Sequence, residues 1–64
     1  MGILERTDQD RVAYLTMNTP EKLNALSDAM LAELQATFDG LRDDRDVRVV
    51  VLSGAGKAFC AGND

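Results

Sequence analysis

Residues 3–17 contain two segments with apolar, β-forming side chains on either side of a polar stretch, which is the pattern of two short strands joined by a turn. Residues 3–6 are predicted to form the first strand, residues 7–10 a polar turn, and residues 11–17 a second strand rich in β-forming side chains. Apolar residues fall on both faces of the second strand, with Val12, Tyr14 and Thr16 on one face and Ala13, Leu15 and Met17 on the other. We therefore expect a β-hairpin whose second strand is buried on both sides.

A helix is predicted after a loop that covers residues 18–25. Pro20 fixes its own φ in this loop and pushes Thr19 toward an extended backbone. Ser27 or Asp28 can cap the helix, since a short polar side chain at that position accepts an otherwise unpaired backbone N–H. Beyond the cap, apolar residues recur at helical spacing, namely Met30, Leu31, Leu34, Phe38 and Leu41. This spacing predicts an amphipathic helix with one apolar face.

A third strand is predicted over residues 47–52, after a charged and solvated connector at residues 42–46. The unbroken apolar run after Arg48 is typical of a central strand of a parallel sheet, covered on both faces. A glycine-rich loop, residues 53–57, and a short apolar run, residues 58–60, follow this strand.

The order strand, strand, helix, strand predicts the α/β fold class. One hairpin and one helix cannot cover both faces of the strand at residues 47–52, and the chain ends at Asn63-Asp64, a pair suited to starting a helix. We therefore expect residues 1–64 to be an N-terminal fragment of a single larger domain. A self-contained small binding module is the alternative, since free-standing domains of this size exist.

Composition narrows the classes of function. The chain has 64 residues, of which 45% are hydrophobic and 28% charged, with a net charge of −4. An acidic chain lacks the basic surface that non-specific nucleic-acid binding requires. No apolar run approaches the roughly 20 residues of a membrane-spanning helix. Cys60 is the only cysteine and histidine is absent, so no internal disulfide or structural zinc is expected. This cysteine usage fits a cytoplasmic protein.

The glycine-rich loop does not match a phosphate-binding motif. A Walker loop requires glycine where Val51 stands and Ser or Thr where Ala58 follows Lys57. A dinucleotide fingerprint requires glycine where Phe59 stands. We therefore interpret the loop as a turn that uses the conformational freedom of glycine.

Acid–base and nucleophilic side chains are not apparent in the chain. Cys60 has no histidine to activate it and is interpreted as a small buried hydrophobe. Residues 61–64 are more informative, because a glycine is followed by the helix-starting pair Asn63-Asp64. The first amides of a helix have no intrahelical partner, and such an amide can stabilise an oxyanion.

Three motifs in the chain resemble the enoyl-CoA hydratase/isomerase (crotonase) family. They are TPEKLNALS at residues 19–27, VRVVVLSG at residues 47–54 and KAFCAGND at residues 57–64, and the likeness covers nearly the whole chain. The resemblance implies a longer superhelix of ββα units, assembled as a homotrimer or homohexamer. This chain would supply its first hairpin, helix, buried strand and oxyanion loop.

The resemblance also implies an acyl-CoA thioester as the substrate, with coenzyme A as part of that substrate and no separate cofactor or metal. In the family, two backbone N–H groups polarise the thioester carbonyl and hold an enolate. The first of them belongs to the residue after the motif glycine, here Asn63. The implied contacts with coenzyme A are made by Lys22, Ala25, Ala61, Gly62, Asn63 and Asp64. Lys22 is either a partner of a coenzyme A phosphate or an exposed loop lysine, and Asn24 is expected to fix its loop through bonds to the backbone.

The expected function is therefore hydration of a 2-enoyl-CoA or a shift of its double bond. The acid–base residues of the family map onto no residue of this chain, so residues 1–64 alone are expected to be inactive. The sequence Gly-Asn-Asp at residues 62–64 resembles some Δ3,Δ2-enoyl-CoA isomerases, whereas hydratases more often have alanine before the aspartate. Expected partners are the acyl-CoA, the remainder of the chain and further copies, without nucleic acid or membrane. The alternatives are a crotonase-like protein that binds CoA or assembles without catalysis, and the small binding module.

Overall fold

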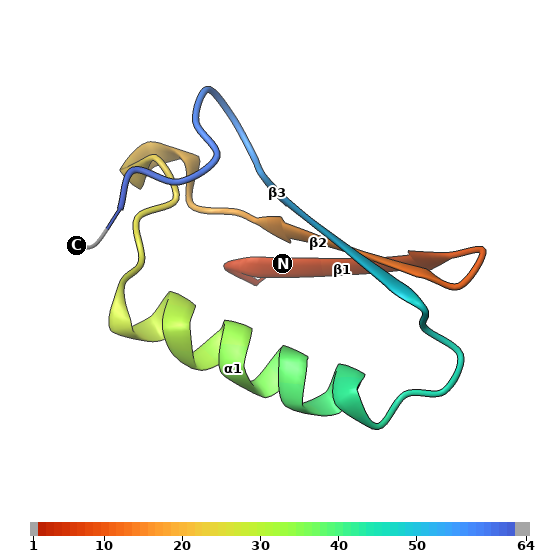
Figure 1. Ribbon diagram of the computed structural model, residues 1–64. Helices are drawn as coiled ribbons and strands as arrows, with labels where there is room; N and C mark the ends of the chain where they lie inside the picture. The colour runs from red at the N-terminus through yellow and green to blue at the C-terminus, as the bar shows by residue number, and fades with distance from the viewer. Residues whose placement is uncertain (1, 63–64) are drawn as a thin grey trace.

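Three strands and one long helix form two layers, with the sheet on one side and the helix on the other (Figure 1). The structure is a computed structural model and describes residues 2–62. Its elements are β1 (Leu4–Gln9), β2 (Val12–Met17), the short 3₁₀ helix η1 (Pro20–Lys22), α1 (Asp28–Arg42) and β3 (Val49–Gly54). Their order and types agree with the predicted α/β class.

The hairpin is longer than its sequence indicated. β1 continues through residues 7–9 and pairs antiparallel with β2, from Leu4 opposite Met17 to Gln9 opposite Val12. The prediction of a turn at residues 7–10 was wrong, because side chains on an exposed edge strand can be polar along its length. The turn consists of Asp10 and Arg11, whose φ angles are 52° and 69°. Two positive φ angles are what a two-residue type I′ hairpin turn requires.

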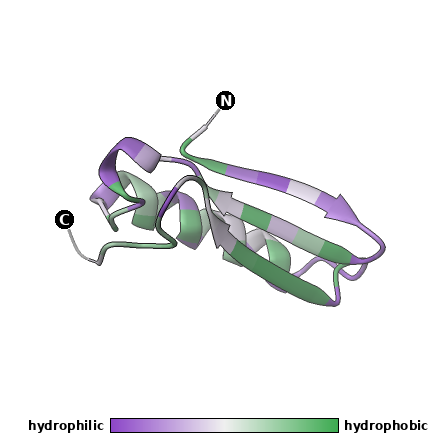
Figure 2. Cartoon of the chain, turned by 90° about the horizontal axis from the view of Figure 1, so that it is seen from above, coloured by the Kyte–Doolittle hydropathy of each residue, from purple (hydrophilic) through white to green (hydrophobic). Residues whose placement is uncertain are grey.

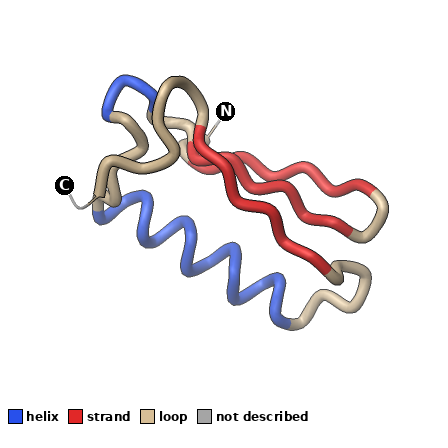
Figure 3. The backbone as a smooth tube through the Cα atoms, turned by 45° about the horizontal axis from the view of Figure 1, so that its top comes forward, coloured by secondary structure: helices blue, strands red, loops and turns tan. Residues whose placement is uncertain are grey.

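α1 covers one face of the sheet (Figure 3). It begins after Ser27, whose hydroxyl accepts the Met30 N–H at 3.2 Å, so the first of the two predicted caps is the one used. The fully or nearly fully buried apolar side chains are Ala13, Leu15, Met17, Met30 and Leu41. Leu31 and Phe38, which the helical spacing placed on the apolar face, are exposed. The apolar face of α1 is therefore wider than the part of it that packs against the sheet within residues 2–62.

Burial of β2 on both sides was also expected, and among residues 2–62 only one face is covered. Ala13, Leu15 and Met17 point toward α1, whereas Tyr14 lies on the opposite face and is exposed. The core cluster of Ala13, Leu15 and Leu41 is completed by partly buried apolar side chains, namely Leu4, Val47 and Leu52.

β3 is parallel to β2, from Val12 opposite Val49 to Met17 opposite Gly54, and forms one edge of the sheet in the order β1-β2-β3. Parallel pairing follows from the helix that connects the two strands. The burial predicted for β3 is absent within residues 2–62, where Val49, Val50 and Val51 are 52%, 38% and 41% exposed. Figure 2 shows this apolar strand on one side of β2 and the mostly polar β1 on the other. The apolar sequence of β3 is thus typical of a strand that packs against further segments on its exposed side.

Arg6 joins β1 to the segment after α1. Its guanidinium donates to the Asp8 carboxylate at 2.8 Å and to Oδ2 of Asp44 at 3.2 Å. The hydrogen bond from Arg6 lowers the pKa of Asp8, and the hydrogen bond to Asp8 raises the pKa of Arg6. Exposed ion pairs of this kind add little stability and are screened by salt. The connector at residues 42–46, predicted to be solvated, is nevertheless tied to the sheet through half-buried Asp44.

Replacing Arg11 with glycine is expected to stabilise the protein. A side chain in the left-handed region costs about 1 kcal/mol, a cost that glycine avoids. The carbonyl of Arg11, which accepts the Arg48 N–H at 2.8 Å, is retained in the variant. We expect the free energy of unfolding in urea to rise by about 1 kcal/mol.

Arg45→Gly is the matched control, since Arg45 lies in a connector and its φ is not positive. This change adds freedom to the unfolded chain and should lower stability. Equal effects of the two substitutions would contradict the assignment of strain to the hairpin turn.

Candidate functional site

Asn24 ties together two loops that are far apart in the sequence. Its Oδ1 accepts the Thr19 N–H at 2.9 Å, and its Nδ2 donates to the carbonyls of Ala55 at 2.9 Å and Ala58 at 2.8 Å. The side chain is 0% exposed and is the one buried polar side chain within residues 2–62. We call residues 18–26 the asparagine loop, residues 54–62 the glycine loop, and the contact between them the loop junction. The prediction that Asn24 fixes its loop through backbone groups is confirmed.

The asparagine loop contains two consecutive left-handed residues. Leu23 and Asn24 have φ angles of 53° and 55°. Asparagine adopts this region readily, but leucine does not, at a cost of about 1 kcal/mol or more. The loop offsets the cost with backbone hydrogen bonds, from the Leu23 N–H to Pro20 O at 3.0 Å and from the Asn24 N–H to Thr19 O at 3.0 Å. Sequence reasoning missed this conformation, because nothing in a leucine side chain signals it.

Glycine is required at position 54 by close packing. A Cβ atom at Gly54 would lie 2.4 Å from the Phe59 carbonyl oxygen and 2.7 Å from Nδ2 of Asn24. The sequence suggested conformational freedom as the reason for the glycines, and that reason applies to Gly56, whose φ is 85°. Gly56 also faces Pro20 directly, since a Cβ there would lie 2.9 Å from Cβ of Pro20. Both glycines thus let the glycine loop pack directly on the asparagine loop.

Two backbone hydrogen bonds complete the loop junction. The Ala61 N–H donates to the Leu23 carbonyl at 2.9 Å, and the Leu26 N–H donates to the Gly62 carbonyl at 2.8 Å. In Figure 1 the blue C-terminal segment accordingly runs beside the yellow segment that leads into α1. The Gly62 N–H donates to Sγ of Cys60 at 3.4 Å. The amides of Ala61 and Gly62 are therefore both engaged within the chain.

The loop junction brings together most of the residues for which the sequence suggested ligand contacts. Lys22 is exposed at the end of η1, Ala25 is half-buried, and Ala61 and Gly62 lie in the segment bonded to the asparagine loop. Asn63 and Asp64 lie outside the described residues. The role of Cys60 as a hydrogen-bond acceptor was missed, because it depends on the turn of the backbone at Gly62.

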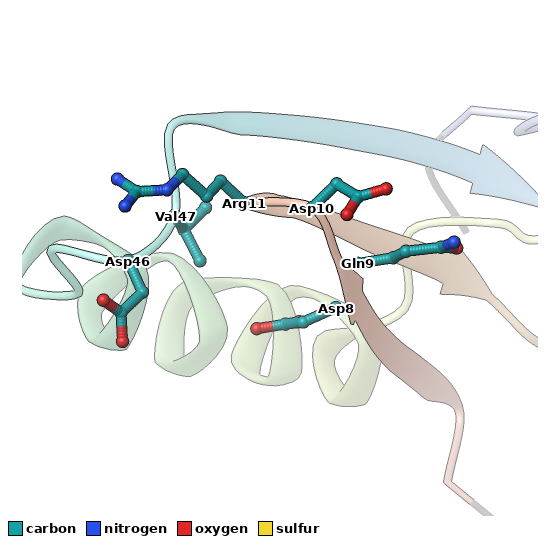
Figure 4. A pocket seen from close by; sticks show the side chains of 6 residues that line it. All are labelled: Asp8, Gln9, Asp10, Arg11, Asp46 and Val47. Carbon is teal, nitrogen blue, oxygen red and sulfur yellow. The ribbon is translucent and has the colours of Figure 1, made fainter.

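A hollow at the hairpin turn lies at the other end of the sheet from the loop junction (Figure 4). It is lined by Asp8, Gln9, Asp10, Arg11, Asp46 and Val47. The side chains of Asp10 and Arg11 point in opposite directions and do not converge on one point. In the part of the chain that the structure describes, no three His, Cys, Asp or Glu side chains are grouped to bind a metal. Among the described residues, the groups best placed to take part in binding or catalysis are therefore the backbone groups at the loop junction.

The chain is similar in sequence to known proteins. A family model described as enoyl-CoA hydratase/isomerase matches residues 7–64. A probable enoyl-CoA hydratase of Mycobacterium tuberculosis is 51% identical over 53 residues, which are 83% of this chain and 21% of that protein. The 3-hydroxyisobutyryl-CoA hydrolase 1 of Arabidopsis thaliana is 44% identical over 57 residues, which are 89% of this chain and 15% of that protein.

Solved structures agree with these sequence matches. The crystal structure of an enoyl-CoA hydratase of Mycobacterium smegmatis superposes with a TM-score of 0.95 at 49% identity, covering 100% of this chain and 25% of that chain. This chain therefore spans between 15% and 21% of the length of the two curated relatives and a quarter of the solved one.

Substitution of Gly54 tests the packing at the loop junction. Gly54→Ala places a methyl group against the Phe59 carbonyl and Asn24, and backbone atoms there cannot yield without breaking the Asn24 bonds. We expect a loss of about 2–3 kcal/mol in the free energy of unfolding, measured by urea denaturation.

Gly40→Ala is the matched control, because a Cβ at this exposed position of α1 meets nothing within 4 Å. It should stabilise the protein by about 1 kcal/mol through helix propensity. A Gly54→Ala variant as stable as the unsubstituted protein would show that the two loops do not pack as described.

Proposed function

The chain belongs to the enoyl-CoA hydratase/isomerase family, and on that premise we propose that it forms the N-terminal part of an enzyme acting on acyl-CoA thioesters. The proposed reaction is hydration of a 2-enoyl-CoA or a shift of its double bond, through an enolate of the thioester. One observation carries the proposal: the loop junction holds residues 61–62 directly beside residues 23–26. These are the two segments for which the family resemblance implies contacts with the acyl-CoA.

In this proposal the thioester carbonyl is polarised by a backbone amide. Negative charge develops on the carbonyl oxygen as the enolate forms, and a preorganised N–H stabilises that charge without the cost of reorganising solvent. The family resemblance implies the N–H of Asn63 for this role, and the amides of Ala61 and Gly62 donate within the chain. A backbone donor of this kind is independent of the side chain at its position.

Coenzyme A would lie along the exposed side of the asparagine loop. Lys22 is exposed at the end of η1 and offers a mobile positive charge to a phosphate group. Ala25, Ala61 and Gly62 have small side chains or none, so a ligand can approach the backbone there. We assign Asn63 and Asp64 to the same contact surface. No metal or separate cofactor enters the proposed reaction.

The exposed apolar side chains of this segment indicate that other parts of the protein pack against it. We propose that the remainder of the chain covers the open edge of β3 and the sheet face opposite α1, and that it supplies the acid–base side chains and the second amide donor. The exposed side chains of Val49, Val51 and Phe59 fit such a covered position. We also propose assembly as a homotrimer or homohexamer in the cytoplasm. Among residues 2–62, α1 and η1 are too short or too polar to cross a membrane.

Turnover of a 2-enoyl-CoA tests the proposal directly. The loss of ultraviolet absorbance by the conjugated thioester is followed with the whole enzyme and with residues 1–64 alone. We expect turnover by the whole enzyme and none by residues 1–64, because no acid–base residue of the family maps onto them. A whole enzyme that neither binds coenzyme A nor acts on acyl-CoA would refute the proposal, and robust turnover by residues 1–64 would refute the placement of the acid–base groups elsewhere.

Substitution of Lys22 tests how coenzyme A is held. Lys22→Ala should raise KM for the CoA thioester about three- to tenfold, since one charge-assisted contact with a phosphate is lost. KM for the corresponding N-acetylcysteamine thioester, which lacks phosphate, should not change. Equal changes for both substrates would mean that Lys22 acts on the loop and not on the phosphate.

A further inference from the structure

The two lysines of the chain lie on the two loops that meet at the loop junction. Lys22 is exposed at the end of η1, and Lys57 is exposed in the glycine loop. The five arginines lie elsewhere: one is in β1, and the others are at the hairpin turn or within residues 42–48, near the opposite end of the sheet (Figure 1). The only positive side chains on the two loops are therefore these lysines.

Two contacts between the loops hold the lysines close together. Gly56 packs against Pro20, since a Cβ atom at Gly56 would lie 2.9 Å from Cβ of Pro20. The Ala58 carbonyl accepts a hydrogen bond from Nδ2 of Asn24 at 2.8 Å. On each loop, the lysine lies between these two contact residues in the sequence. In Figure 3 the short helix η1 accordingly lies beside the loop that follows β3.

Neither lysine forms an ion pair among residues 2–62. The ion pairs in that range are those of Arg6 with Asp8 and Asp44, and Glu21, which precedes Lys22, takes part in none of them. Two like charges held close together repel each other, and an anion bound between them offsets this repulsion. A lysine ammonium is a compact charge on a flexible four-carbon stem, so two of them can adjust to neighbouring phosphate groups. The pair is therefore suited to an anion with more than one phosphate.

We propose that Lys57 is a second residue that binds the phosphate groups of coenzyme A, acting with Lys22 from the other loop of the junction. Coenzyme A carries a diphosphate and a 3′-phosphate, so it offers separate negative charges to two ammonium groups. This inference rests on the proposed function, in which the ligand is an acyl-CoA. The glycine loop lacks the sequence of a backbone phosphate-binding loop, and in this role it acts through a side chain.

Lys57→Gln in the whole enzyme removes the charge and nearly keeps the length of the side chain. KM for a 2-enoyl-CoA should rise about three- to tenfold, while kcat stays close to that of the unsubstituted enzyme, because the lost contact is remote from the reacting carbonyl. Lys57→Arg, which keeps the charge, should retain most of the affinity. Arg45→Gln is the matched control, since it removes an exposed positive charge at the other end of the sheet and should leave KM unchanged.

Shortened substrates identify the phosphate that Lys57 contacts. The thioester of dephospho-CoA lacks the 3′-phosphate. A smaller effect of Lys57→Gln with this substrate assigns Lys57 to the 3′-phosphate, and an equal effect assigns it to the diphosphate. With the N-acetylcysteamine thioester, which lacks phosphate, Lys57→Gln should leave KM unchanged.

Three results would overturn the inference while leaving the proposed function intact. They are an unchanged KM for the CoA thioester in Lys57→Gln, an equal rise in KM with the N-acetylcysteamine thioester, and an equal rise in KM in Arg45→Gln. The second result would mean that Lys57 acts on the loop, and the third that net charge alone matters. An unsubstituted enzyme that does not bind coenzyme A would instead overturn the proposed function itself.

Discussion

One buried carboxamide holds the loop junction of this chain together. The side chain of Asn24 bonds to a backbone group five residues before it and to carbonyls 31 and 34 residues after it. A single side chain therefore connects the loop that precedes α1 with the loop that follows β3. Each buried backbone group left without a partner would cost about 1–3 kcal/mol, which gives these bonds a large influence on the local structure. Asn24 itself adopts the left-handed conformation next to Leu23, and a Cβ atom at Gly54 would lie 2.7 Å from its Nδ2, so the contact requires glycine there.

This construction suits a reaction that depends on a backbone amide. A side chain can be directed by choosing its rotamer, but a backbone N–H can be directed only by fixing the chain around it. The Ala61 and Leu26 hydrogen bonds fix the backbone of the loop junction through residue 62, close to the segment where coenzyme A is proposed to lie. Contacts made by the remote part of the substrate can thereby help to place the reacting carbonyl, which is how binding energy supports catalysis.

The sequence predicted those features that depend on local chemistry. A cap at Ser27 or Asp28 and the bonds of Asn24 to its own loop could be foreseen, because short polar side chains bond to nearby backbone groups. Features that are imposed by contacts between distant segments could not be predicted from the sequence. The polar strand at residues 7–9 is defined by its partner β2, the left-handed Leu23 by the loop it closes, and the acceptor role of Cys60 by the turn at Gly62. The apolar run of β3 correctly indicated a parallel strand, whereas its burial requires neighbours that residues 2–62 do not contain.

Amide hydrogen exchange most directly tests whether Asn24 makes the two loops one unit. The amides of Leu26 and Ala61, which lie on different loops and bond across the junction, should open with the same free energy in the unsubstituted protein. In Asn24→Ala both should lose protection together, whereas Asn18→Ala, whose side chain forms no hydrogen bond within residues 2–62, should leave both unchanged. Independent opening of the two amides, or retained protection in Asn24→Ala, would contradict the central role given to Asn24.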